Sequence, residues 1–236
     1  MIGEAGVADV DEVALAYRAA GDPDRPPMVL LHGLGDAAAD WDGVLPALAR
    51  RHRVFALDLR GHGLSSQPGR YSFELMRDDV AGFLAALGIE KCVLVGHSMG
   101  GTVAILLAQT APELLDRLVL EDVTAPRPGA LPRPPLDPPE EPTPFDFAAV
   151  NAIRAQINEP DPAWWEGLAG ITVPTLIVGG SNSPIPHELL TDTVELMPDA
   201  RLVTLDAGHH VHKDRPAEFV AAVDAFLGSA DQPDTL

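Results

Sequence analysis

Short apolar runs alternate with segments of helical periodicity along most of this chain, and that alternation leaves few folds open. Strands separated by helices form βαβ units, which build a mostly parallel sheet with helices packed on its faces. The apolar runs predict core strands at 28–31, 54–57, 92–95, 118–120, 175–178 and 201–205, with an earlier antiparallel edge strand at 13–17. The intervening segments predict helices at 41–50, 74–87, 101–109, 188–197 and 216–227. The sequence therefore predicts an α/β fold.

Length and composition agree with one globular domain. The chain has 236 residues, of which 46% are hydrophobic and 22% are charged. α/β architectures of about 200–250 residues commonly form a single unit. We therefore expect residues 1–236 to form one domain. Because Cys92 is the only cysteine, it cannot form an intrachain disulfide, and its apolar surroundings predict a core position.

One segment interrupts the alternation. Nine prolines occur between residues 125 and 144, so neither a helix interior nor a central strand can pass through it. Residues 145–168 then return to helical spacing and end in an aromatic pair. We interpret about 125–171 as a short, proline-rich cap insertion. It is either a lid over a pocket or a rigid surface connection.

The charge of the chain excludes several classes of partner. With 16 basic and 35 acidic residues, its net charge is −19. Nucleic acids and anionic membrane surfaces both attract basic proteins, so neither is an expected partner. No window approaches the ~18 consecutive apolar residues of a membrane span. The first six residues do not resemble a secretory signal, and the expected location is the cytoplasm.

A serine lies at a sharp turn between a predicted strand and a predicted helix. The stretch 93–101 contains Gly-x-Ser-x-Gly, with Gly96 and Gly100 on either side of Ser98. Such a turn needs glycines because its backbone is strained and crowded, and it exposes the serine hydroxyl. It also directs the Met99 backbone N–H toward a developing oxyanion. The motif predicts that Ser98 is a nucleophile, whereas the alternative is a turn serine without chemistry.

Two further motifs follow strand ends. His32-Gly33-Leu34-Gly35 is a glycine-rich loop in which the Leu34 N–H can stabilise a carbonyl oxygen. After the last strand, His209, His210 and His212 are candidate general bases for a serine, and their spacing does not choose among them. A metal pair formed by His210 and His212 is disfavoured, because no Cys, Asp or Glu stands at ligand spacing. We expect neither a metal nor a cofactor.

These motifs occur in a characteristic order: His32-Gly33-Leu34-Gly35, Asp58-Leu59-Arg60-Gly61-His62-Gly63-Leu64-Ser65, Gly96-His97-Ser98-Met99-Gly100-Gly101 and Gly208-His209. In this order the chain resembles the α/β-hydrolase fold superfamily, from about residue 13 to residue 227. The resemblance implies that Ser98 is the nucleophile and that His209, directly after the glycine, is the base. It further implies that Leu34 and Met99 supply the oxyanion hole.

The acid departs from the pattern of many relatives, which carry an aspartate after the strand at 175–178. Here the stretch 179–186 has no carboxylate, and Ser183 stands at the aligned position. Glu121 and Asp122 end the preceding strand, where some members, including haloalkane dehalogenases, place their acid. Strand alternation sends these two side chains to opposite sides. The alignment favours Asp122, with Glu121 as second choice. If neither reaches His209, a Ser–His dyad or a degenerate site remains.

The expected function is that of a serine hydrolase. It would cleave a small ester-like substrate through a Ser–His–acid triad and a covalent acyl-enzyme. One alternative is other chemistry on the same fold, such as C–C bond hydrolysis or cofactor-free peroxidase activity. Another is a non-catalytic ligand-binding protein, which the missing acid after residue 178 would explain.

Overall fold

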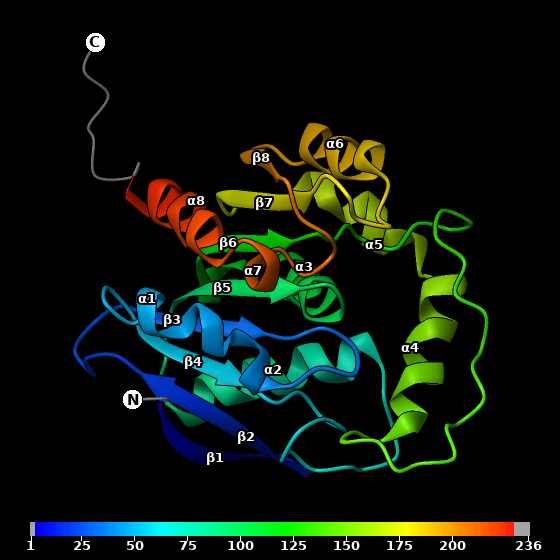
Figure 1. Cartoon of the computed structure of the whole chain (residues 1–236), viewed down its shortest axis with the longest axis horizontal. Coiled ribbons are helices and arrows are strands. Elements are labelled where there is room, and N and C mark those ends of the chain that lie inside the picture. The colour runs from blue at the N-terminus through cyan, green and yellow to red at the C-terminus, as the bar shows by residue number, and fades with distance from the viewer. Residues whose placement is uncertain (1–2, 229–236) are drawn as a thin grey trace.

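The protein is built around one eight-stranded sheet with the strand order β1-β2-β4-β3-β5-β6-β7-β8 (Figure 1). The computed structural model describes residues 3–228. The strands are β1 (Glu4–Val10), β2 (Val13–Ala20), β3 (Pro27–Leu31), β4 (Arg53–Leu57), β5 (Cys92–His97), β6 (Leu115–Glu121), β7 (Thr175–Gly180) and β8 (Ala200–Leu205). The strands from β3 to β8 pair in parallel, whereas β1 and β2 are antiparallel. The predicted α/β architecture is confirmed.

The expected edge strand is not at the edge. Strand β2 is antiparallel as predicted, but β1 pairs along its outer side and takes the edge position. Only Ala8 and Val10 of β1 are buried, so this strand lacks the continuous apolar run that would predict it from the sequence. The hairpin between the two strands turns at Asp11, whose φ of 46° suits a tight two-residue connection.

Helices cover both faces of the sheet and form two hydrophobic clusters with it. Helices α2 (Phe73–Ala86) and α3 (Met99–Thr110) lie on one face, together with α6 (His187–Leu196). The 3₁₀ helix η1 (Ala38–Gly43), α1 (Leu45–Leu48), α7 (Val211–Asp214) and α8 (Pro216–Gly228) lie on the other. The single helix expected at 41–50 is divided into η1 and α1. Pro46 explains the break, because proline is tolerated only in the first turn of a helix.

The proline-rich segment is irregular up to residue 146, as predicted, and helices follow it. They are α4 (Phe147–Asn158), α5 (Pro162–Glu166) and the 3₁₀ helix η3 (Gly167–Gly170). A further 3₁₀ helix, η2 (Pro112–Leu114), lies earlier in the chain, directly before β6. In Figure 1, α4 stands beyond the arrowheads of β5 and β6, at the carboxyl ends of these strands.

Side chains of α4 hold the proline-rich segment in place. Asn151 accepts from the backbone N–H of Leu136 and donates to its carbonyl, both at 2.9 Å. Asn158 binds the N–H and carbonyl of Arg133 in the same way, at 2.6 and 2.8 Å. An amide side chain can bind a backbone donor and a backbone acceptor at the same time. These bonds replace the backbone–backbone hydrogen bonds that a proline-rich segment cannot form.

Cys92 opens β5 and is 1% exposed. Burial raises the pKa of its thiol to about 12, so the side chain acts as a small apolar group. Over residues 3–228, no helix is both long and apolar enough to cross a membrane.

Candidate active site

Ser98 lies between β5 and α3 in a conformation that side chains rarely adopt. Its φ is 50° and its ψ is −114°. A Cβ atom on Gly96 would lie 2.5 Å from the carbonyl oxygen of Gly100, and one on Gly100 would lie 2.5 Å from that of Leu31. These contacts explain the two glycines of the motif. The turn leaves the Ser98 hydroxyl at the carboxyl end of the sheet, beside a cavity.

His209 lies in the loop between β8 and α7 and bridges two of the predicted residues. Its Nε2 is 2.9 Å from Ser98 Oγ, and its Nδ1 is 2.6 Å from Asp122 Oδ2. Because a carboxylate only accepts, Nδ1 carries the proton and Nε2 is left to accept from the serine hydroxyl. The structure therefore brings Ser98, His209 and Asp122 into one hydrogen-bonded chain.

Asp122 follows the last residue of β6 and is completely buried. Its φ of 50° turns the chain at the strand end. Besides His209, the carboxylate accepts from the Gly180 N–H at 3.0 Å and from the Ser183 hydroxyl. Three donors compensate the burial of this charge. Ser183, which stands at the position that the resemblance aligns with an aspartate, thus donates its hydroxyl to a carboxylate that follows the neighbouring strand.

Glu121, the second choice for the acid, faces a different histidine. Its carboxylate lies 2.8 Å from both the backbone N–H and the Nδ1 of His212. The His212 ring stacks on Trp41 with centroids 4.2 Å apart, on the η1 side of the sheet. The two adjacent carboxylates diverge, as strand alternation predicts. Glu121 anchors the histidine loop to β6 three residues after His209.

The Glu121→Gln variant is expected to lose stability and retain catalysis. Glutamine keeps one acceptor for His212 but removes the buried charge, which lowers the free energy of unfolding by about 1–3 kcal/mol. Urea unfolding and kcat should be compared with those of Glu113→Gln, an exposed control just before β6. A loss of kcat comparable to that from changing Asp122 would contradict this assignment.

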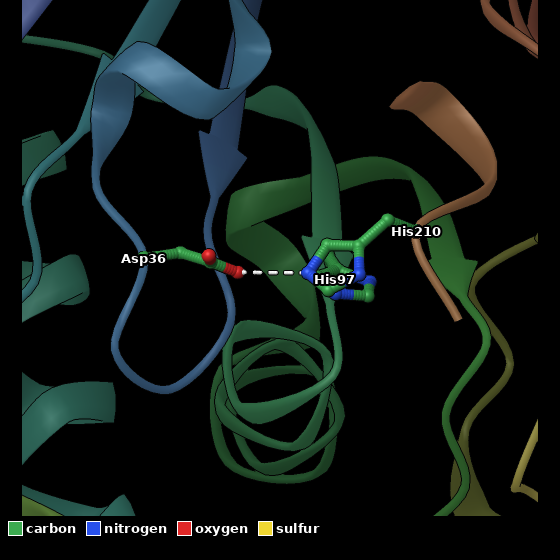
Figure 2. Close-up of side chains that lie close together, drawn as sticks. All are labelled: Asp36, His97 and His210. Atoms are coloured by element: carbon green, nitrogen blue, oxygen red, sulfur yellow. Dashed lines mark hydrogen bonds and ion pairs between the residues drawn. The ribbon is translucent and has the colours of Figure 1, made fainter. Parts of the chain in front are cut away.

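A second group of side chains converges beside Ser98 and His209. Figure 2 shows Asp36, His97 and His210 arriving from three separate segments. His210 Nε2 lies 3.3 Å from Asp36 Oδ2. His97 is 1% exposed, and burial followed by the neighbouring His209 lowers its pKa well below the ordinary value. A neutral His97 packs 4.7 Å from the His209 ring, measured between centroids, and supports it without placing a charge there.

No carboxylate stands at metal-ligand spacing from His210 and His212 along the sequence, but carboxylates from distant segments lie close to both histidines in the fold. In space, Asp36 with His97 and His210, and Glu121 with His97 and His212, place potential metal-ligand atoms within 4.8 Å of one another. Each carboxylate already has a partner. The Lys213 ammonium lies 3.6 Å from Asp36, and His212 holds Glu121. A cation at Asp36 would have to displace that ammonium.

The predicted oxyanion donors, Leu34 and Met99, line the same cavity as Ser98 and His209. Met99 is the first residue of α3, so its N–H has no acceptor within the helix. The two donor segments are joined, because the Gly100 N–H donates to the His32 carbonyl at 3.1 Å.

His32 holds the loop that carries Leu34. Its Nδ1 donates to the Gly33 carbonyl at 2.7 Å, and its Nε2 accepts from the Leu59 N–H at 3.0 Å. Burial, with a smaller effect of nearby His62, lowers the pKa of His32 to about 3. The ring therefore stays neutral at physiological pH and keeps its acceptor.

The cavity encloses about 280 Å³, and the cap segment supplies much of its wall, including Arg127, Leu131, Arg133 and Ile153. The segment therefore forms part of the wall of this cavity. The two adjacent tryptophans pack in different places. Trp164 is buried against Phe73, whereas Trp165 packs under Arg127, and neither lines the cavity.

Comparison with known proteins defines the class. The family model for the alpha/beta hydrolase fold matches residues 26–146 of the chain. The chain belongs to this family, in agreement with its sheet topology and with the resemblance of its four motifs.

Individual relatives are hydrolases. The sn-1-specific diacylglycerol lipase ABHD11 of Mus musculus is 29% identical over 267 residues, covering 93% of this chain and 87% of that protein. The ABHD11 lipase of Xenopus laevis is 30% identical, with 87% and 80% covered. A solved hydrolase of Pseudomonas aeruginosa PA01 is 28% identical with a TM-score of 0.81, and covers 96% of this chain and 99% of its own. The protein is accordingly an enzyme of the hydrolase type.

Proposed function

We propose that the protein is a serine hydrolase that cleaves a small carboxylic ester through a covalent acyl-enzyme. The observation that carries this proposal is the continuous chain from Ser98 Oγ through His209 to the buried carboxylate of Asp122. Each group has the role that its chemistry allows. The serine attacks, the histidine moves a proton, and the aspartate fixes the tautomer of the histidine.

In the first half of the reaction, Ser98 Oγ attacks the ester carbonyl carbon while His209 Nε2 accepts the hydroxyl proton. The resulting oxyanion is stabilised by the N–H groups of Leu34 and Met99. Collapse of the tetrahedral intermediate breaks the bond to the alcohol, which leaves with the proton from His209. In the second half, water attacks the acyl-enzyme through the same histidine and releases the acid.

The size of the cavity supports an ester of modest size, and the names of the relatives support hydrolysis of esters. A volume of about 280 Å³ lies near the lower end of typical small-molecule sites. The mouse and frog relatives are named as diacylglycerol lipases, and a solved membrane phospholipase A is 26% identical with a TM-score of 0.80. It covers 98% of this chain and 87% of its own. The contact between Asp122 and His209 supports catalysis over a non-catalytic protein, because that alternative rested on a missing acid.

An acyl-enzyme on Ser98 is the expected test result. With p-nitrophenyl butyrate, the enzyme should release p-nitrophenolate in a burst equal to the active-site concentration when deacylation is slower than acylation. Mass spectrometry of acid-quenched enzyme should find the butyryl group on a Ser98 peptide. The exposed Ser181 serves as an internal control and should remain unmodified.

Absence of both ester turnover and acylation of Ser98 would contradict the proposal. Turnover of a C–C bond substrate, or peroxide-dependent oxidation, without ester cleavage would instead favour the other chemistries known on this fold.

A further inference from the structure

The cap segment separates its charges in space. Residues 125–171 contain three basic side chains, Arg127, Arg133 and Arg154, and all three line the cavity. The same segment contains seven acidic residues, none of which lines it: Asp137, Glu140, Glu141, Asp146, Glu159, Asp161 and Glu166. Among the described residues that form the wall, Asp122 is the only carboxylate, and it is held by His209. The part of the cavity wall that the cap segment supplies is therefore cationic in a chain of net charge −19.

The three arginines differ in how they are held. Arg127 pairs with Asp192 at 3.2 Å, and its guanidinium lies 4.8 Å above the ring of Trp165. Arg154 uses Nε to donate to the Pro134 carbonyl at 2.8 Å, which places it beside the residue that follows Arg133. Within residues 3–228, no carboxylate oxygen lies within 4.0 Å of the guanidinium nitrogens of Arg133 or Arg154.

Arg133 and Arg154 are both half-buried and line the same cavity, and burial weakens the solvation of a guanidinium group that has no carboxylate partner. Elsewhere this acidic chain supplies carboxylates to Arg18, Arg53, Arg60 and Arg70. An anion that enters the cavity would provide the missing partner, and guanidinium groups bind carboxylate and phosphate oxygens through paired hydrogen bonds.

We propose that Arg133 and Arg154, supported by Arg127, form an anion subsite, so that the preferred substrate is an ester carrying a carboxylate or phosphate group away from the scissile bond. This proposal rests on the proposed ester hydrolysis at Ser98 and adds the substrate class. The remote anion fixes the ester in the cavity while its carbonyl lies at Ser98. Binding energy from a non-reacting group can be used to orient the reacting one.

The arginines of the subsite also offset the repulsion between this acidic protein and an anionic substrate. A net charge of −19 repels anionic molecules from the protein surface as a whole. A local cationic wall at the cavity reverses that effect over a short distance, because salt screens charges beyond about 10 Å. Selectivity for an anionic ester would therefore arise at the cavity itself.

Matched ester pairs test the proposal. On the acyl side, mono-p-nitrophenyl adipate is compared with p-nitrophenyl hexanoate, which has the same chain length without the carboxylate. On the alcohol side, 1-hexanoylglycerol 3-phosphate is compared with 1-hexanoylglycerol by titration of the released acid. The wild-type enzyme should prefer the anionic member of at least one pair by about 10-fold in kcat/KM, mainly through KM. The preferred pair identifies which side of the ester carries the anion.

Substitution of the arginines should remove the preference. The double variant Arg133→Gln with Arg154→Gln is expected to reduce the ratio of the two kcat/KM values about 10-fold, and Arg133→Glu should invert it. Arg51→Gln, an exposed arginine outside the cavity wall, is the control and should keep the wild-type ratio. Raising NaCl from about 0.05 to about 0.5 M should lower the preference of the wild type.

The outcomes separate this inference from the proposed function. Equal kcat/KM values for both members of both pairs, with the neutral esters still hydrolysed at Ser98, would overturn the anion subsite alone. An unchanged ratio in the double arginine variant would overturn it as well. Failure to hydrolyse any of the four esters would overturn the proposed function.

Discussion

Replacing Ser98 with alanine is expected to lower kcat for ester hydrolysis by at least about 10⁴-fold. The substitution removes the atom that forms the acyl-enzyme, so His209 has no hydroxyl to activate. Loss of the nucleophile in a serine protease costs about 10⁶ in kcat, and the remaining activity arises from the oxyanion hole and substrate binding. If Leu34 and Met99 stabilise the oxyanion as proposed, the Ser98→Ala variant should keep a residual rate about 10³–10⁴-fold above that of the uncatalysed reaction.

The measurement is steady-state hydrolysis of p-nitrophenyl butyrate, with labelling by a fluorophosphonate probe as a second readout. Ser98→Ala should show no labelling, whereas Ser181→Ala should label and turn over like the wild type. Circular dichroism and urea unfolding establish that the Ser98 variant is folded. Alanine also has to adopt the φ of 50° found at this turn, so a modest loss of stability is expected. Substantial turnover by the folded alanine variant would show that the nucleophile lies elsewhere.

Replacing Asp122 with asparagine is expected to lower kcat by about 10⁴-fold, as the equivalent change does in a serine protease. If the asparagine side chain directs its oxygen toward the Gly180 N–H, as the Asp122 carboxylate does, its NH₂ group points toward His209. Nδ1 of His209 must then accept, so the ring proton moves to Nε2. In that tautomer Nε2 points a hydrogen at Ser98 Oγ and cannot take the serine proton.

The control for Asp122→Asn is Asp206→Asn, which changes a carboxylate in the same loop region. Asp206 accepts from the Asn182 side chain at 2.9 Å and is exposed, so its loss should alter kcat by no more than a few fold. The Asp122 variant should still bind a fluorophosphonate slowly, because Ser98 remains. If both aspartate variants keep wild-type kcat, Asp122 is not the acid of the triad.

The sheet and the sharp turn at Ser98 could be predicted because both depend on local patterns. Strands such as β5 and β7 are buried along their whole length, and burial on both faces produces the continuous apolar runs that mark them. The Ser98 turn is visible for the same reason, since its crowded backbone requires glycines two residues away. Strand β1 was missed because it is an edge strand with two buried side chains and therefore has no such run.

The position of Asp122 beside His209 and the position of the proline-rich segment depend on contacts between distant residues. Asp122 and His209 are 87 residues apart, and the choice between Asp122 and Glu121 depends on which histidine lies on each side of β6. Ser183 stands at a position where the sequence has no carboxylate, and its hydroxyl meets Asp122 only when β6 and β7 pair. The cationic wall of the cavity has the same origin, because Arg133 and Arg154 come together only when α4 binds the proline-rich segment.

The sequence by itself determined the α/β architecture, the sharp strand-to-helix turn at Ser98 and the loop that carries His209. These are short-range features, because a few neighbouring residues determine the hydrophobic periodicity, the placement of glycines and the ends of strands. The tertiary structure alone decided that Asp122 faces His209, that Glu121 holds His212 and that the arginines of the cap face the cavity. The partners in these interactions are 20 to 91 residues apart, and only the folded sheet and cap bring them together.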